Sequence, residues 1–191
     1  MEMPQSEIDL TGMLLIAMPG MGDPRFETSV VYICAHSPEG AMGLIVNKPA
    51  TEIAFDDLLE QLKIARGDGG HGLGVHFGGP VEHGRGFVLH SGDYNSDEST
   101  MRINDDFSMT ATRDILADIA GGGGPEQRIL MLGYAGWGPG QIEDEISQNG
   151  WLSCAADPNV VFGRADAGKW EAALRSMGVE PIMLSGDAGH A

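Results

Sequence analysis

The chain has 191 residues and a formal net charge of −17, from 28 acidic against 11 basic side chains. Non-specific nucleic-acid binding depends on Lys and Arg that neutralise phosphates, and here these residues are scattered singly, so the composition disfavours direct DNA binding. The same charge disfavours an anionic membrane surface. Hydrophobic residues make up 42% of the chain, which excludes a disordered polymer and fits one folded domain over residues 1–191.

Glycine is unusually frequent, with 29 residues in the chain, about twice its ordinary ~7% share. This abundance predicts many tight turns and short strands. The apolar runs are much shorter than the ~18 residues of a membrane span, and the first ten residues are acidic, without the pattern of a signal peptide. We therefore expect a cytoplasmic protein without a membrane helix, in which residues 1–10 form a loosely ordered lead-in.

The first half of the chain predicts strands around one helix. Residues 13–17 are continuously apolar and predict a buried strand, and residues 29–47 predict a β-hairpin turning at 36–40. Phe55, Leu58 and Leu59 recur at helical spacing, which predicts an amphipathic helix up to residue 62.

Shorter elements follow. Short strands are predicted at 75–77, 86–90, 101–103 and 107–109, and a helix capped by Thr110 or Thr112 is predicted to end at Ala120. Further on, we expect an extended segment at 159–162 and a helix at 167–177.

The stretch from 128 to 154 carries the densest pattern in the chain. Residues 129–132 predict a buried strand, and the glycines that follow predict a tight turn over 133–140, because glycine adopts positive φ without a steric penalty. Pro139 suits the first turn of a short acidic helix, Asn149-Gly150 ends it, and Trp151 opens another strand. The glycine spacing matches no phosphate-binding loop, so we interpret it as a shaped backbone corner.

Groups that could do chemistry are present but do not form a motif. His76, His83 and His90 recur every seven residues, yet glycine and proline between them break any helix that would align them, so we expect no metal site. Cys34 lies in an apolar strand, where a thiol usually behaves as a small hydrophobe, although a pair with His36 is conceivable. Two cysteines give neither a disulfide framework nor a zinc-ligand spacing, and we expect no cofactor.

Adjacent acids complete the search for chemistry. Glu143 and Asp144 could form a catalytic or cation-binding pair, but neighbouring positions on a helix point in different directions. We interpret them as a solvated face.

A set of loop and strand-end residues is the better candidate for a site. Loops on a rigid scaffold are where binding residues concentrate, and an aromatic side chain beside glycine-opened backbone suits a pocket. We predict that these loops meet on one face and form a surface for a ligand or protein partner. Its members are Asp23, Pro24, Phe26, Asn47, Pro49, Gly78, Gly79, Pro80, His90, Tyr134, Gly136, Trp137 and Gln141.

Four segments in register give the chain a family resemblance. These segments, 12–49, 76–90, 133–152 and 189–191, resemble the bacterial YqgE/AlgH family in the same order along nearly the whole chain. The resemblance implies a single α+β domain with a coiled, branched mixed β-sheet and a few flanking helices. It also implies a bacterial cytoplasmic protein. Some members carry the label of transcriptional regulator, but the family's activity is not established, and it supplies no catalytic residues.

The sequence thus favours a non-enzymatic binding or regulatory protein that acts through a protein partner or a small ligand. The alternative is an enzyme, such as a hydrolase, whose groups are scattered along the sequence and meet at the glycine-rich face. A regulator that contacts DNA directly is the third and least favoured hypothesis, given the charge of the chain.

Overall fold

The computed structural model describes residues 8–19, 26–70, 73–96 and 99–184. They form one α+β domain built on a nine-stranded sheet, in which strands follow the order β6-β7-β5-β8-β3-β2-β1-β9 and β4 branches off β8. The β4–β8 pair is parallel and the other pairs are antiparallel, so the sheet is mixed. The expected α+β class with a curled, branched sheet is confirmed.

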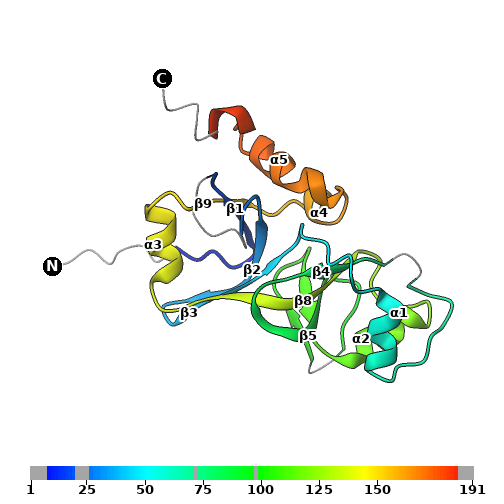
Figure 1. Ribbon diagram of the computed structural model, residues 1–191. Coiled ribbons are helices and arrows are strands. Elements are labelled where there is room, and N and C mark those ends of the chain that lie inside the picture. Colours follow the sequence, from blue (N-terminus) through cyan, green and yellow to red (C-terminus); the bar gives the residue numbers. More distant parts are fainter. Residues whose placement is uncertain (1–7, 20–25, 71–72, 97–98, 185–191) are drawn as a thin grey trace.

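The strands divide into two groups that share β8 (Figure 1). The first group is β1 (Met13–Ala17), β2 (Val30–Ser37), β3 (Gly40–Ile45) and β9 (Trp151–Ala155). The second group is β4 (Val75–Phe77), β5 (Val81–His90), β6 (Thr100–Arg102) and β7 (Ser108–Thr110). We call these groups the first half and the second half of the sheet.

β8 (Arg128–Trp137) joins the two halves because different parts of it pair with different strands. Its residues 128–134 pair with β5, and residues 130–132 also pair with β4. Its last three residues pair with β3 of the first half. The sequence prediction of a turn at 133–140 is therefore wrong for residues 133–137, which continue the strand.

The glycines in β8 have a long-range cause. Gly133 has φ of 77°, and a Cβ there would lie 2.3 Å from the carbonyl oxygen of Gly79. Gly79 has φ of 155°, and a Cβ there would lie 2.0 Å from the Tyr134 carbonyl carbon. The two glycines allow the segment before β5 to pass directly against β8, so they serve a crossing of two chain segments.

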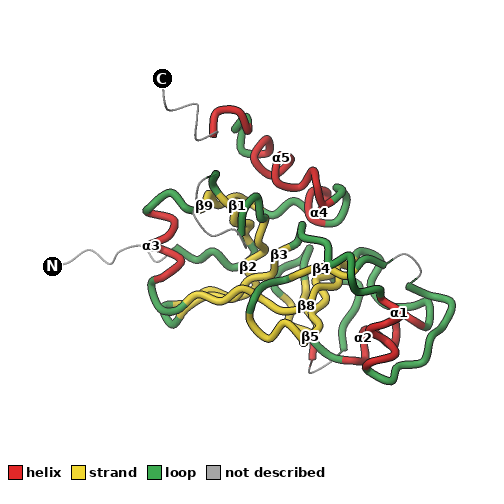
Figure 2. Tube along the Cα trace, viewed as in Figure 1, coloured by secondary structure: helices red, strands yellow, loops and turns green. Residues whose placement is uncertain are grey.

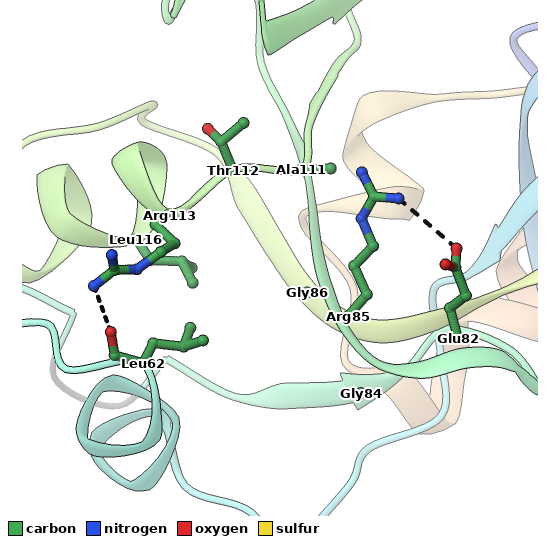
Figure 3. Close-up of a pocket in the computed structure, with 9 residues that line it drawn as sticks. All are labelled: Leu62, Glu82, Gly84, Arg85, Gly86, Ala111, Thr112, Arg113 and Leu116. Atoms are coloured by element: carbon green, nitrogen blue, oxygen red, sulfur yellow. Dashed lines mark hydrogen bonds and ion pairs between the residues drawn. The ribbon is translucent and has the colours of Figure 1, made fainter.

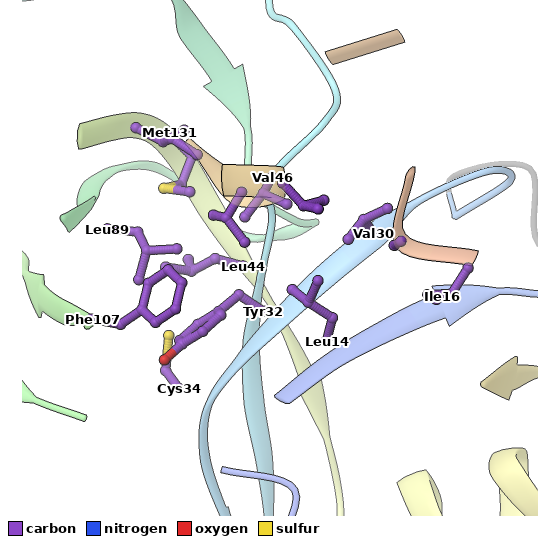
Figure 4. Packing of buried hydrophobic residues seen from close by; sticks show 14 of the residues in the cluster. Leu14, Ile16, Val30, Tyr32, Cys34, Leu44, Val46, Leu89, Phe107 and Met131 are labelled. Atoms are coloured by element: carbon purple, nitrogen blue, oxygen red, sulfur yellow. The ribbon is translucent and has the colours of Figure 1, made fainter. Parts of the chain in front are cut away.

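Side chains of neighbouring strand residues point to opposite faces of the sheet. Apolar clusters cover both faces, so successive residues of one strand belong to different clusters. In β2, Tyr32 and Cys34 point into the cluster shown in Figure 4, whereas Val31 and Ile33 pack on the opposite face. In β8, Met131 joins the cluster of Figure 4 while its neighbours Leu130 and Leu132 pack beneath two helices.

The helices cover the faces in three places (Figure 2). α1 (Phe55–Gln61) and α2 (Arg113–Ala120) cover the second half, with apolar side chains at helical spacing. α3 (Gln141–Ser147) inserts Ile142 beside Trp137 and Trp151 of the first half. α4 (Pro158–Val161) and α5 (Asp166–Ser176) cover the remaining face, and a 3-10 helix follows at Pro181–Leu184.

Three local predictions are corrected. Residues 159–162 were expected to be extended, but residues up to Val161 lie in α4, where Asp157 accepts a hydrogen bond from the Asn159 amide and Pro158 starts the helix. Pro139 precedes Gly140, the left-handed N-cap residue of α3, so it lies outside the first turn of the helix. Leu10 belongs to the expected loose lead-in but is buried in the core.

Candidate functional site

A shallow groove lies where the β2–β3 hairpin passes the end of β8. It has a volume of about 620 Å³ and is lined mainly by apolar surface. It is lined by residues 35–37, 39–42, Val81, Tyr134, Gly136 and Trp137. We call it the hairpin groove.

The apolar floor of the hairpin groove continues the core cluster of Figure 4. Met42 and Tyr134 are half-buried and pack against that cluster, and the Tyr134 ring meets Phe87 edge-on at 5.8 Å between centroids. Val81 is paired with Tyr134 across the ladder and is 36% exposed. A core surface that extends into an open groove is typical of a binding site.

Gly136 keeps this floor open. It pairs with Met42, and an added Cβ would lie 3.6 Å from the Tyr134 ring and 3.9 Å from Val81. These are ordinary contact distances, and Gly136 does not have positive φ. A variant with a larger residue at position 136 should therefore fold, and the added side chain would occupy the groove.

His36 and Glu143 form a polar pair beside the groove. The Leu10 amide donates to His36 Nδ1 at 3.0 Å, which places the ring proton on Nε2, and Nε2 donates to Glu143 Oε1 at 2.5 Å. Burial, the largest single effect, favours the neutral acid, but the His36 hydrogen bond, a hydrogen bond from the Glu143 backbone and the charge interaction with His36 together hold the pKa of Glu143 below its usual value. Asp144 is exposed and the Glu143 side chain is 41% exposed, so both acids contact solvent as predicted, although His36 engages one Glu143 oxygen.

Glu145 has a structural role behind the groove. One of its carboxylate oxygens accepts from the indole nitrogens of both Trp137, at 3.3 Å, and Trp151, at 3.0 Å. The two rings meet edge-on at 6.1 Å. The indole of Trp137 is therefore fixed in the core, so it supports the groove rather than reaching out to a ligand.

Three of the predicted site residues, Tyr134, Gly136 and Trp137, come together in the hairpin groove. Asn47 and His90 do not line it and are buried. The Asn47 side chain accepts from the Val30 amide and donates to the Thr28 carbonyl, which clamps two loops together. His90 makes hydrogen bonds through both ring nitrogens, to the Ser91 carbonyl and the Thr110 hydroxyl.

The other predicted residues that the structure describes also lie outside the hairpin groove. Pro49 bridges to His76 and lines a separate pocket beside α1. Gly78 and Gly79 are buried at the crossing with β8, and Pro80 follows them half-buried.

Two members of the predicted set support the first half. Phe26 packs edge-on against Trp151 at 5.7 Å. Gln141 accepts from the Gly138 amide just before α3. Asp23 and Pro24 lie outside the described residues.

The candidate nucleophile is not activated. Burial raises the pKa of the Cys34 thiol to about 12, so it stays protonated near neutral pH. Both ring nitrogens of His36 already have partners, Leu10 and Glu143.

A second polar cluster links the two halves of the sheet. Asp166 lies 2.8 Å from His76 Nε2 and 3.0 Å from the buried Lys169 ammonium, which also donates to the Val46 carbonyl. Burial lowers the pKa of Lys169, against the opposing effect of Asp166. Among the described residues, no group of three His, Cys, Asp or Glu side chains could hold a metal ion.

The sequence pattern did not reveal Met42, Val81 or the His36–Glu143 pair. Met42 and Val81 resemble ordinary strand residues, and only the register of β3, β5 and β8 shows that they share a face. His36 and Glu143 are 107 positions apart. No local pattern carries such a signal.

Fold and groove together define a single-domain α+β protein with a curled, branched sheet and an apolar groove beside a histidine–carboxylate pair. Within the described ranges, no helix has the length and apolar character needed to cross a bilayer. Residues 14–182 match the model of a family described as AlgH-like. The chain belongs to this AlgH-like family.

Similar proteins support the assignment. A UPF0301 protein of Paracoccus denitrificans is 60% identical over 96% of this chain and 97% of its own length, and one from Ruegeria pomeroyi is 58% identical over 96% and 100%. The solution structure of AlgH from Pseudomonas aeruginosa matches with a TM-score of 0.79 and 40% identity over all of both chains. A crystal structure of a Corynebacterium diphtheriae protein shares the fold, with a TM-score of 0.70 at 20% identity over 96% and 94% of the chains.

Proposed function

We infer that the protein is a non-enzymatic binding or regulatory protein of the bacterial cytoplasm. Its hairpin groove holds an apolar segment of a protein partner. The observation that carries this proposal is the floor of Met42, Val81 and Tyr134, which extends the core surface into an open groove of about 620 Å³. Burying such side chains contributes about 25 cal/mol per Å² of apolar area.

Charge suggests which segment fits. Glu39 lines the groove and Glu143 lies beside it, within a chain of net charge −17. A partner segment with an apolar anchor and flanking Lys or Arg would be attracted over a distance and held by the floor. The label of transcriptional regulator in the resembled family would then reflect contact with a protein of the transcription apparatus, without contact to DNA.

The rival proposal, a hydrolase working in the same groove, lacks a base with a free nitrogen at this position. His36 is the histidine that lines the groove, and both of its ring nitrogens have partners within the chain. A histidine that acts as a general base needs an unpaired ring nitrogen within hydrogen-bond reach of the proton it removes. With His36 as the base, the rival therefore requires Nδ1, which carries the lone pair of the ring, to lose its hydrogen bond from the Leu10 amide first.

Photo-crosslinking in cells tests the binding proposal. A benzophenone amino acid replaces Met42, and the matched control carries it in place of the exposed Glu171 on α5. We expect a discrete protein adduct from position 42 and none from position 171. The adduct should disappear when Gly136→Leu fills the groove.

A glycine control separates blocking from misfolding. Gly168 lies exposed in α5, with nothing within 4 Å of an added Cβ, so Gly168→Leu should keep the adduct. Absence of any adduct at position 42, or its survival in Gly136→Leu, would contradict the proposal. Turnover in a broad esterase screen that Gly136→Leu abolishes would favour the hydrolase.

A further inference from the structure

A second pocket lies in the other half of the sheet, between the end of α1, the start of α2 and the middle of β5. It has a volume of about 450 Å³, within the usual range for small-molecule sites. In Figure 3, Arg113 with Leu62 lies on one side of it, and Arg85 with Glu82 lies on the other. We call it the arginine pocket.

The charge of the arginine pocket is opposite to that of the chain as a whole. Two of the 11 basic residues of the chain, Arg85 and Arg113, line this one pocket, against the single acid Glu82. Two cations around one concavity favour an anionic ligand.

The Arg85 guanidinium is available for a ligand. Its nearest carboxylate is Glu82, at 3.7 Å, which is beyond hydrogen-bond distance. Its Cζ lies 5.2 Å from the centroid of the Phe87 ring, a cation–π contact that orients the side chain without using its N–H groups. Among the described residues, no acceptor forms a hydrogen bond with it.

Arg113 is only partly used. One of its terminal nitrogens donates to the Leu62 carbonyl at the end of α1, and reaches the Lys63 carbonyl at 3.4 Å. A guanidinium has five N–H donors, so donors remain. Beside it, the Thr112 hydroxyl oxygen is buried and has no partner in the described part of the chain, although Thr112 lines the pocket.

The rest of the lining is apolar and open. Leu62, Ala111 and Leu116 present aliphatic surface. Gly84 lies in an irregular part of β5, where the register with β8 shifts between Val81 and Gly86, and an added Cβ at Gly84 would meet nothing within 4 Å. Register shifts of this kind, β-bulges, are common beside functional sites, where they change the direction in which side chains point.

From this combination we propose that the arginine pocket binds a small amphipathic anion, a carboxylate with an aliphatic body. The carboxylate displaces Glu82 from Arg85, and the aliphatic body lies along Leu62 and Leu116. This site shares no lining residue with the hairpin groove, so its test does not depend on the binding function proposed there.

Octanoate is the test probe, followed by amide shifts in two-dimensional NMR of the full chain. We expect saturable binding with a dissociation constant of about 1 mM or below, with shifts at residues 84–86 and 111–116. Octanol, which lacks the charge, and inorganic phosphate, which lacks the aliphatic body, should each bind far more weakly. Each added methylene should tighten binding by up to about fourfold.

Three variants locate the site. Arg85→Gln should weaken octanoate binding about tenfold, because a charge-assisted hydrogen bond is lost. Glu82→Gln should tighten it by up to about fivefold, since the competing carboxylate is removed. Gly84→Leu should fill the space and abolish saturable shifts at these residues.

Arg175 supplies a matched control, because it pairs with Glu171 at 3.7 Å and with similar exposure to the Arg85–Glu82 pair. Arg175→Gln should leave octanoate binding unchanged. Thermal melts and the dispersion of the NMR spectrum show whether each variant is folded. The proposal is overturned if octanoate does not saturate, if octanol or phosphate binds as tightly, or if Arg85→Gln and Arg175→Gln behave alike.

Discussion

The two halves of the sheet are stabilised by different interactions. Ionic groups stabilise the first half and its junction with the second: Glu145 accepts from two indoles, and Asp166 pairs with the buried Lys169 and with His76 of β4. The second half is held by apolar packing of α1 and α2 and by a neutral hydrogen-bond chain from His90 through Thr110 to Thr100. A single fold can thus have one half that depends on charge, together with its junction to the other half, and a second half whose own packing is mainly apolar.

Asp166→Ala should have the largest effect. It removes the carboxylate that faces both His76 and Lys169, and among the described residues it leaves the buried ammonium with only the Val46 carbonyl. Loss of one partner from a buried ion pair costs about 3–5 kcal/mol. Urea denaturation should show this decrease in the free energy of unfolding, and Lys169→Met should cost clearly less because the charge is removed as well. Equal losses in the two variants would contradict the ionic account of this half.

Ile119→Ala is the corresponding change in the second half. Ile119 is fully buried on the inner face of α2, and a cavity there should cost about 3 kcal/mol. The loss should be the same in low and high salt, because no charge is involved. The exposed Asp114→Ala on the same helix should stay within about 0.5 kcal/mol of the parent. A strong salt dependence of the Ile119→Ala loss would contradict the claim that the second half is stabilised mainly by apolar packing.

Glu145→Ala should have a smaller effect, of about 2 kcal/mol, because two indole N–H groups lose their acceptor. Glu145→Gln should cost less, since a carboxamide oxygen still accepts. Urea titration followed by tryptophan fluorescence measures both. If the alanine and glutamine variants were equally stable, the carboxylate would not be holding the two rings.

The smallest expected effect is the pH-dependent part of the stability change in His90→Gln, which is separate from the pH-independent loss of the two ring hydrogen bonds. Burial lowers the pKa of His90 in the folded state below its usual value near 6.5. The unfolded chain therefore binds a proton as pH falls through about 6.5 while the folded ring stays neutral, so stability is lost in that direction. Urea denaturation between pH 7.5 and pH 5 should show a shallower decline for His90→Gln, and an unchanged slope would contradict a buried neutral ring.

Elements with a strong local pattern were predictable from the sequence. The spacing of Phe55, Leu58 and Leu59 predicts α1, and the structure buries these three side chains. The β2–β3 hairpin and the strand at 13–17 were predicted for the same reason.

Features that depend on distant neighbours were not predictable. The glycines of β8 resemble a local turn, but Gly133 is needed because Gly79, far away in sequence, passes against it. The four residues of α4 include two valines, which favour an extended segment. The N-cap residue Asp157 and Pro158 at the first helical position predict the helix correctly. Of the residues that line the hairpin groove, the sequence predicted only the three that belong to β8, which are Tyr134, Gly136 and Trp137.

The shared strand has a consequence for cooperativity. Because β8 donates and accepts ladder hydrogen bonds in both halves, neither half can open along it without exposing the other. Local opening should then be confined to the outlying strands β6 and β9. In native-state hydrogen exchange, the amides of Leu130 to Leu132 and of Ala135 should exchange together, at the free energy of global unfolding.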